Sequence, residues 1–98
     1  MTTPSTLHRL DAVFEGDVQG VGFRWTVLRI VGDRFPSVTG EIENLHDGTV
    51  RLAAEDTPGE LRRLLDTILV SRLAPGIQSV RHAFTPIPRR RYSFFSPR

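Results

Sequence analysis

The first regular pattern along the chain is an alternation of apolar residues with intervening positions near its start. Leu10, Ala12 and Phe14 occupy every second position. A period of two residues is that of a β-strand with one buried face, so we expect a strand here. The glycine-rich segment GDVQGVG, residues 16–22, follows it directly.

From Phe23 onward the spacing of apolar residues changes to that of an amphipathic helix. The apolar stripe consists of Phe23, Val27, Ile30 and Val31, with Trp25 and Leu28 beside it. We therefore expect a helix that begins at Phe23 and places both Phe23 and Trp25 in the core. It should end at Phe35-Pro36, because a residue before proline avoids the helical region.

The middle of the chain predicts a β-hairpin. Residues 38–45 and 49–55 are rich in strand-forming residues, and His46-Asp47-Gly48 lies between them. Asp-Gly between two such runs is a strong local signal for a tight turn.

A second helix should begin at Thr57-Pro58-Gly59-Glu60, which matches a capping box with proline in the first helical position. Its apolar face consists of Leu61, Leu64, Leu65, Ile68 and Leu69, and Pro75-Gly76 should end it. Residues 77–84 predict a fourth strand. Residues 92–95, beyond Pro86 and Pro88, could add a short edge strand.

The order strand, helix, strand, strand, helix, strand predicts an α+β, ferredoxin-like (split βαβ) two-layer sandwich. In this fold an antiparallel sheet carries two helices on one face. A doubly wound parallel sheet is less favoured, because it needs a longer chain with more crossovers. We expect one domain over residues 1–98, with a flexible N-terminus at 1–6 and a basic, proline-containing C-terminal segment at 85–98.

The amino-acid composition excludes several kinds of functional site. The 98 residues include no cysteine, which excludes disulfides, thiolate metal sites and a cysteine nucleophile. No apolar stretch approaches the length of a membrane span or a signal peptide, so we expect a cytoplasmic protein that does not bind membranes.

All 13 basic residues are arginine, and they are unevenly distributed. Residues 1–88 carry a net charge of −2 and residues 89–98 a net charge of +4. The basic and aromatic C-terminal segment is compatible with RNA binding. We favour an edge strand preceded by a solvated arginine run, which also discourages edge-to-edge aggregation, and we do not expect a nucleic-acid partner.

The segment GDVQGVGFR, residues 16–24, is the strongest candidate for a functional site. Glycines let successive N–H groups point into one concavity, and the segment opens into a helix N-terminus, a geometry that binds phosphate-sized anions. Arg24 could add a bidentate guanidinium contact. A glycine-rich turn with a solvated arginine explains the residues equally well. Asn44, before the Asp47-Gly48 turn, could orient a water, although shaping the hairpin is the simpler role.

Two segments, GDVQGVGFR (16–24) and GEIENLHDGTV (40–50), resemble the signature segments of acylphosphatases. TPGELRRLLD (57–66) resembles the second helix of that family, and the resemblance spans roughly residues 8–84. It implies an α/β sandwich that hydrolyses acyl phosphates to a carboxylate and inorganic phosphate without a metal or cofactor.

The resemblance also assigns residue roles. Arg24 and the backbone N–H groups of Gln19, Gly20, Val21, Gly22 and Phe23 would hold the phosphoryl oxygens, and Asn44 would orient the attacking water. The expected partner is a small acyl phosphate, with phosphate or sulfate able to occupy the loop, and we expect a monomer. His8, His46 and His82 lack metal-ligand spacing, so we expect no metal site.

The sequence departs from the family at three acidic residues. Many members have GWVRN where this chain has Gly40-Glu41-Ile42-Glu43-Asn44, and Asp17 lies within the loop. Alternation puts Glu41 and Glu43 on the sheet face opposite Asn44. At about 10 Å in water each would repel an anion by only roughly 0.4 kcal/mol. The alternative function is a catalytically weak module of this fold that binds an anion or a protein partner.

Overall fold

The computed structural model describes residues 6–20 and 22–98. Along the chain the elements are β1 (His8–Gly16), α1 (Phe23–Arg34), β2 (Thr39–Asn44), β3 (Val50–Asp56), α2 (Pro58–Leu69), a 3₁₀ turn (Ala74–Gly76), β4 (Ile77–Pro86) and β5 (Phe95–Pro97). Residues 1–5 of the predicted flexible N-terminus, and Val21 of the predicted phosphate loop, lie outside the described residues.

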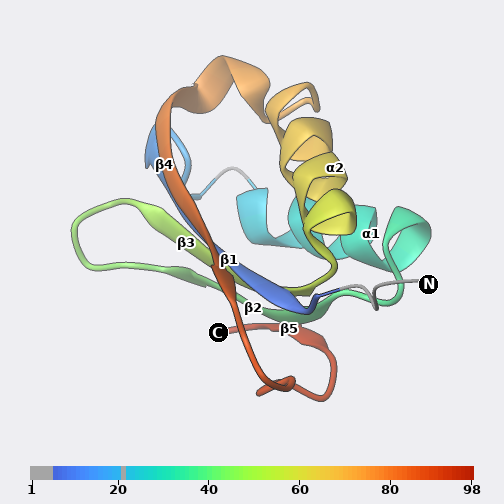
Figure 1. Ribbon diagram of the computed structural model, residues 1–98. Coiled ribbons are helices and arrows are strands. Elements are labelled where there is room, and N and C mark those ends of the chain that lie inside the picture. Colours follow the sequence, from blue (N-terminus) through green and yellow to red (C-terminus); the bar gives the residue numbers. More distant parts are fainter. Residues whose placement is uncertain (1–5, 21) are drawn as a thin grey trace.

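The strands form one sheet in the order β4-β1-β3-β2-β5. Both helices lie on the same face of it, which confirms the ferredoxin-like two-layer arrangement (Figure 1). The four longer strands pair antiparallel, as predicted. The sheet is nevertheless mixed, because β5 pairs with β2 in parallel.

The core lies between the sheet and the helices. Leu10, Ala12 and Phe14 of β1 face it and are completely buried. They lie directly opposite Ala54, Leu52 and Val50 of β3, which are also completely buried. Burial of each large apolar side chain contributes about 1.5–3 kcal/mol, so this register is strongly determined by the alternation in the sequence.

Helix α1 confirms one of the two predicted aromatic core residues and contradicts the other. Phe23 is buried and its ring lies 5.1 Å from that of Phe14, whereas Trp25 is 75% exposed. Two residues of helix correspond to a rotation of about 200°, which carries Trp25 away from the face defined by Phe23 and Val27. The prediction that Trp25 belongs to the core was therefore wrong.

Helix α2 begins where the capping box predicted and ends earlier than expected. The N–H of Glu60 donates to Oγ1 of Thr57 at 3.4 Å, and Pro58 is the first helical residue. The helix ends at Leu69, and Pro75-Gly76 lies in the separate 3₁₀ turn. That turn leads directly into β4.

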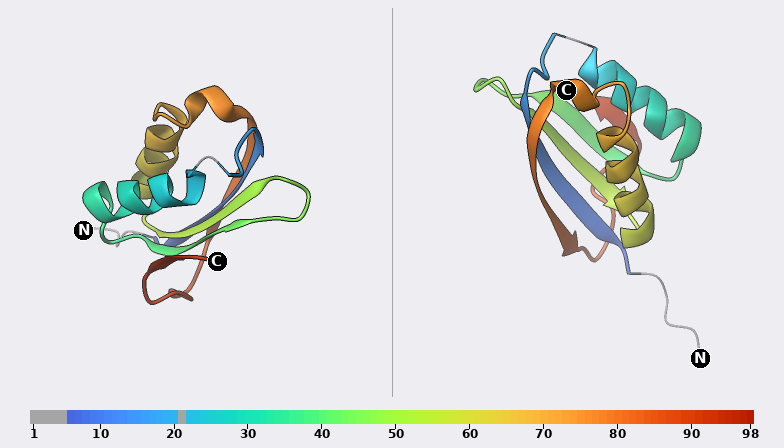
Figure 2. Two further views of the ribbon diagram at one scale, coloured as in Figure 1. Left: turned by 180° about the vertical axis from the view of Figure 1, so that it is seen from behind. Right: turned by 90° about the horizontal axis from the view of Figure 1, so that it is seen from above.

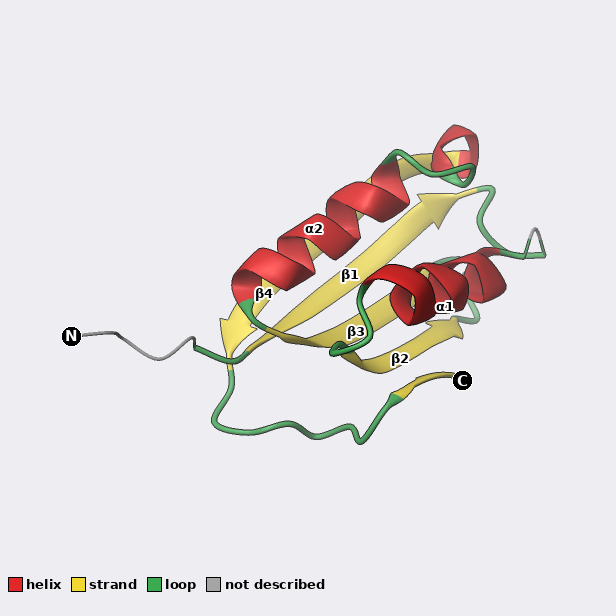
Figure 3. Ribbon diagram, turned by 90° about the vertical axis from the view of Figure 1, so that its right-hand side faces the viewer, coloured by secondary structure: helices red, strands yellow, loops and turns green. Residues whose placement is uncertain are grey.

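Residues 87–98 are here called the C-terminal strap. The strap runs from the end of β4 at one edge of the sheet to the opposite edge, where it ends in β5. Because β4 and β5 lie at opposite edges, the strap must pass beneath the face that the helices leave uncovered, and Figures 2 and 3 show this path. Its last residues place β5 beside β2 and close the sheet edge nearest α1.

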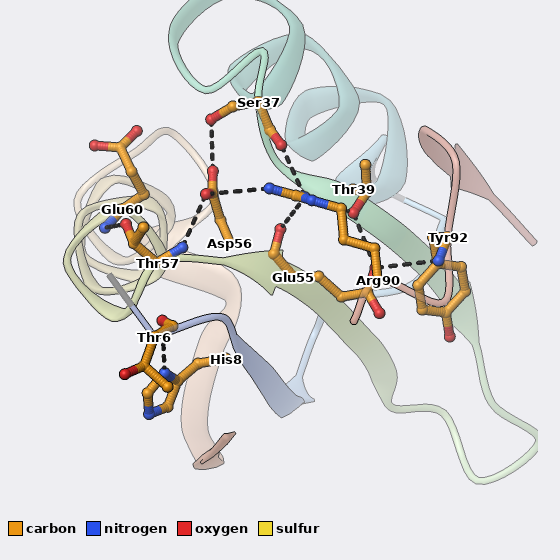
Figure 4. Close-up of polar contacts among 10 residues, drawn as sticks. All are labelled: Thr6, His8, Ser37, Thr39, Glu55, Asp56, Thr57, Glu60, Arg90 and Tyr92. Atoms are coloured by element: carbon orange, nitrogen blue, oxygen red, sulfur yellow. Dashed lines mark hydrogen bonds and ion pairs between the residues drawn. The ribbon is translucent and has the colours of Figure 1, made fainter. Parts of the chain in front are cut away.

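Arg90 of the strap is exposed, as the prediction of a solvated arginine run implies, but its side chain also makes several polar contacts that the sequence did not predict. Its guanidinium donates to the carbonyl oxygens of Ser37 and Glu55 at 3.0 and 2.9 Å, and pairs with Asp56 at 3.3 Å (Figure 4). It also donates to Oγ1 of Thr39 at 2.8 Å. Its neighbours in the run, Arg89 and Arg91, are exposed as well.

Candidate active site

Two glycines of the loop between β1 and α1 have a left-handed backbone. Gly20 and Gly22 both have φ of +75°, a left-handed conformation that other residues rarely adopt. Gly22 is the N-cap of α1, and the first helical bond runs from the N–H of Thr26 to the carbonyl of Gly22 at 3.0 Å. The N–H groups of the first helical turn therefore have no acceptor within the helix.

A cavity of about 240 Å³ lies at this helix N-terminus, and the two predicted catalytic residues are part of its lining. Arg24 and Asn44 both line it, together with Gly20, Gly22 and Phe23 of the predicted phosphate loop. Val18 and Trp25 complete the wall. The first turn of α1 contains no acidic residue, so the positive end of the helix dipole is available to an anion.

The β2–β3 hairpin brings Asn44 to the cavity. Asn44 is the last residue of β2 and is exposed. The turn beyond it is closed by a bond from the N–H of Leu45 to the carbonyl of Thr49 at 2.9 Å. Because Asn44 lies on the same sheet face as buried Ile42, its side chain is on the helix side, where the cavity lies.

Gln19 connects the loop to this hairpin. Its Nε2 donates to the carbonyl oxygens of both Leu45 and Thr49, each at 2.8 Å. The side chain of Gln19 is thus used to hold the hairpin. Only its main-chain N–H is left for the phosphate contact that the sequence predicted.

Arg24 is held by the end of the C-terminal strap. Its Nη1 donates to the main-chain oxygen of Arg98 at 2.8 Å. A guanidinium has five N–H donors, so this contact fixes one edge of the group and leaves donors for a ligand. Arg98 had no part in the sequence prediction, because 74 residues separate it from Arg24 and only the sheet order brings the two together.

The acidic residues that depart from the family pattern lie away from the cavity. Glu41 and Glu43 pair with Arg51 at 3.4 and 3.2 Å on the opposite face of the sheet, as alternation predicted. Asp17 is exposed and lines a different depression with Arg72 and Gly76. None of the three lines the cavity between Arg24 and Asn44.

The histidines are dispersed. His8 contacts the carbonyl of Thr6, His46 is exposed in the hairpin turn, and His82 packs against Phe84 on β4. Within residues 6–20 and 22–98, no group of three or more His, Asp or Glu side chains could hold a metal ion. No helix in this part of the chain is both long and apolar enough to cross a bilayer.

Comparison with known proteins identifies the family of this chain. The sequence model of the acylphosphatase family matches residues 10–96. The chain belongs to the acylphosphatase family. It is an enzyme of the hydrolase class that acts on acyl phosphates.

Individual relatives support the assignment. An acylphosphatase of Chlorobaculum tepidum is 40% identical over 75 residues, which cover 76% of each chain. One of Methanospirillum hungatei is 39% identical over 66 residues, covering 67% of this chain and 70% of the relative. The crystal structure of acylphosphatase from Bacillus subtilis superimposes with a TM-score of 0.76 at 22% identity, covering 92% of this chain and 97% of the other.

Two side chains at or near this cavity were not predicted from the sequence. Trp25 lines the cavity beside Arg24, and its high exposure could have been inferred from its position off the apolar helix stripe. Arg72 lies close to the loop, because a β-carbon added at Gly22 would be 3.1 Å from its Nη2. Nothing in the sequence near Arg72 signals that proximity.

Proposed function

We propose that this acylphosphatase cleaves acyl phosphates without a metal ion. In this proposal the phosphoryl group is held by Arg24 and by main-chain N–H groups of residues 19–23, and Asn44 orients the attacking water. The supporting observation is the cavity that Arg24, Asn44 and the loop glycines line together.

The binding step uses fixed positive groups. Helix N-termini bind phosphate because their free N–H groups and dipole favour negative charge. Arg24 adds a cation in the first helical turn and is already oriented by Arg98. Such donors need little reorganisation as charge spreads over the phosphoryl oxygens in the transition state.

The chemical step is a displacement at phosphorus. The oxygen of water forms a bond to phosphorus while the bond from phosphorus to the acyl oxygen breaks, giving a carboxylate and dihydrogen phosphate. A carboxylate leaving group has a pKa of about 4, so it needs little protonation by an enzyme acid. The task left to the protein is to position the water in line, which the Asn44 carboxamide can do by accepting a hydrogen bond from it.

The test is hydrolysis of acetyl phosphate in the presence of a chelator. We expect full activity in excess EDTA, and a loss of about 10²–10³-fold in kcat/KM for both Arg24→Ala and Asn44→Ala. Arg29→Ala, which removes an exposed arginine farther along the same helix, serves as the control for net charge and should retain activity.

Two results would overturn parts of the proposal. Loss of turnover in EDTA with recovery on adding a divalent cation would rule out metal independence. Binding of inorganic phosphate that depends on Arg24, with turnover no higher than that of Asn44→Ala, would instead assign an anion-binding module.

A further inference from the structure

The C-terminal strap ends at the group that binds phosphate in the proposed mechanism. The N–H of Gly40 donates to the carbonyl of Phe94 at 3.0 Å, and the N–H of Arg98 donates to the carbonyl of Ile42 at 2.7 Å. These bonds fix β5 along the outer edge of β2. The main-chain oxygen of Arg98 then accepts from Arg24 at 2.8 Å. The position of the Arg24 guanidinium therefore depends on where the strap is held.

The middle of the strap is anchored by a buried carboxylate. The side chain of Glu55 accepts from the N–H of Arg91 at 2.7 Å. It also accepts from the N–H of Tyr92 at 3.1 Å and from Oγ1 of Thr39 at 2.9 Å, and Figure 4 shows these three residues. Glu55 is only 1% exposed. Hydrogen bonds to a buried carboxylate are among the stronger ones in proteins, so this part of the strap is firmly placed.

The end of the strap is anchored by a second buried carboxylate, that of Glu41. One oxygen of Glu41 lies 3.5 Å from Nη1 of Arg98, and the other lies 3.4 Å from Nη1 of Arg51. Glu41 is 8% exposed, whereas the side chain of Arg98 is 63% exposed. Arg98 is thus held by its N–H on Ile42 and by its side chain on Glu41, while its carbonyl receives Arg24.

We propose that Glu41 is a positioning residue for phosphate binding, acting on Arg24 through Arg98. This inference rests on the proposed role of Arg24. Glu41 supplies the counter-charge for the last residue of the strap. Glu55 contributes to the same positioning indirectly, because it fixes the strap at Arg91 and Tyr92, ahead of Arg98 in the sequence.

Simple electrostatics predicts the opposite effect from positioning, which makes the inference testable. Removing a negative charge near an anion site strengthens anion binding through space. Removing the group that fixes Arg98 lets the Arg24 guanidinium move, which weakens binding even where the net charge has become more favourable.

The experiment measures KM and kcat for acetyl phosphate, and the Kd for inorganic phosphate by calorimetry, in Glu41→Gln, Arg98→Gln and the double variant. We expect each single change to raise KM and Kd about two- to fivefold, the upper part of the range for a partly exposed ion pair. The kcat should fall by less than about twofold, because Asn44 and the loop are untouched. The double variant should match the single ones, because both remove the same contact.

Glu43→Gln is the matched control. Glu43 lies on the same strand and face and also pairs with Arg51, but it has no contact with Arg98. It should leave phosphate affinity unchanged or slightly stronger. If the buried Glu41→Gln change impairs folding, Arg98→Gln is compared with Arg89→Gln, which removes the same charge from an exposed arginine of the strap that is not an ion-pair partner of Glu41; only Arg98→Gln should weaken phosphate binding.

The inference is overturned if Glu41→Gln or Arg98→Gln binds phosphate as tightly as the parent protein, or if their effects add in the double variant. Failure of the proposed function is distinguishable, because Arg24→Ala would then leave phosphate binding and turnover intact. A protein in which only Arg24→Ala abolishes binding retains the proposed function and loses this inference.

Discussion

The amide nitrogen of Gln19 donates to the carbonyl of Leu45, the residue directly after Asn44, at 2.8 Å. The same nitrogen reaches the carbonyl of Thr49 on the other side of the turn. The phosphate loop and the hairpin that presents Asn44 are therefore joined by one side chain. In the proposed mechanism, alignment of the phosphoryl group with the water that Asn44 orients would depend on this connection.

Replacing Gln19 should disturb this alignment. Gln19→Ala leaves two carbonyl oxygens without their donor, so we expect a loss of about 1–3 kcal/mol in the free energy of unfolding. We also expect kcat for acetyl phosphate to fall about tenfold, since small misplacements of reacting groups are costly. Gln78→Ala, at an exposed position on β4, is the control. Unchanged kcat in Gln19→Ala would show that the connection is dispensable.

Two glycines near α1 should respond oppositely to the same substitution. In Gly22→Ala an alanine must adopt a φ of +75°, and its β-carbon would lie 3.1 Å from Nη2 of Arg72. We therefore expect the protein to be destabilised by about 1–2 kcal/mol and to bind phosphate more weakly. Gly32 lies inside α1 with nothing within 4 Å of an added β-carbon. Gly32→Ala should stabilise by about 0.5–1 kcal/mol and leave phosphate affinity unchanged. Urea unfolding and calorimetry measure both effects, and a stabilising Gly22→Ala would contradict the loop geometry.

Arg90 should contribute to stability much more than its neighbour in the arginine run. Arg90→Ala removes the ion-pair partner of Asp56, whose side chain is only 7% exposed. Breaking a fully buried pair costs about 3–5 kcal/mol, and partial exposure of Arg90 reduces our expectation to about 2 kcal/mol. Arg89→Ala should change stability by less than about 0.5 kcal/mol. Equal urea midpoints for the two variants would argue against the anchored strap.

Asp47 provides a pH-dependent marker of the hairpin. The hydroxyl and N–H of Thr49 both donate to its carboxylate and lower the pKa of Asp47 below its usual range. Because the pKa of Asp47 is lower in the folded than in the unfolded state, these bonds stabilise the turn fully at pH values above the unfolded-state pKa of about 3.9. The stabilisation is lost as the pH falls through the folded-state pKa.

Removing the hydroxyl should move this titration. In Thr49→Ala the NMR titration midpoint of the Asp47 carboxyl should rise towards that of an unperturbed aspartate. The difference in stability from the parent protein should be present at neutral pH and disappear at low pH. An unchanged midpoint would show that the hydroxyl bond does not form in solution.

The parts of this molecule that depend on local pattern could be predicted from sequence. The alternation of Leu10, Ala12 and Phe14 fixed the face of β1, and Thr57 with Glu60 fixed the start of α2. The glycines and Arg24 made the loop a candidate site from local sequence alone, whereas the role of Asn44 was implied only by the resemblance to acylphosphatases. That residues of both segments line one cavity is a finding of the structure.

The remaining features depend on contacts between distant parts of the chain. A run of arginines resembles a solvated surface until the path of the strap brings Arg90 against Asp56. The pairing of Glu41 with Arg98 requires knowing that β5 lies beside β2, and a three-residue strand leaves almost no periodic signal. Trp25 was assigned to the core because apolar character was given more weight than its angle on the helix.

The contact between Arg24 and Arg98 has a practical consequence for how the enzyme is handled. Any tag, linker or fused domain joined after Arg98 would start within hydrogen-bonding distance of the cation proposed to hold substrate. His8, where β1 begins, lies at the far end of that strand from Gly16 and the loop (Figure 2). A group attached ahead of His8 therefore enters the described fold at the opposite end of β1 from the glycine-rich loop.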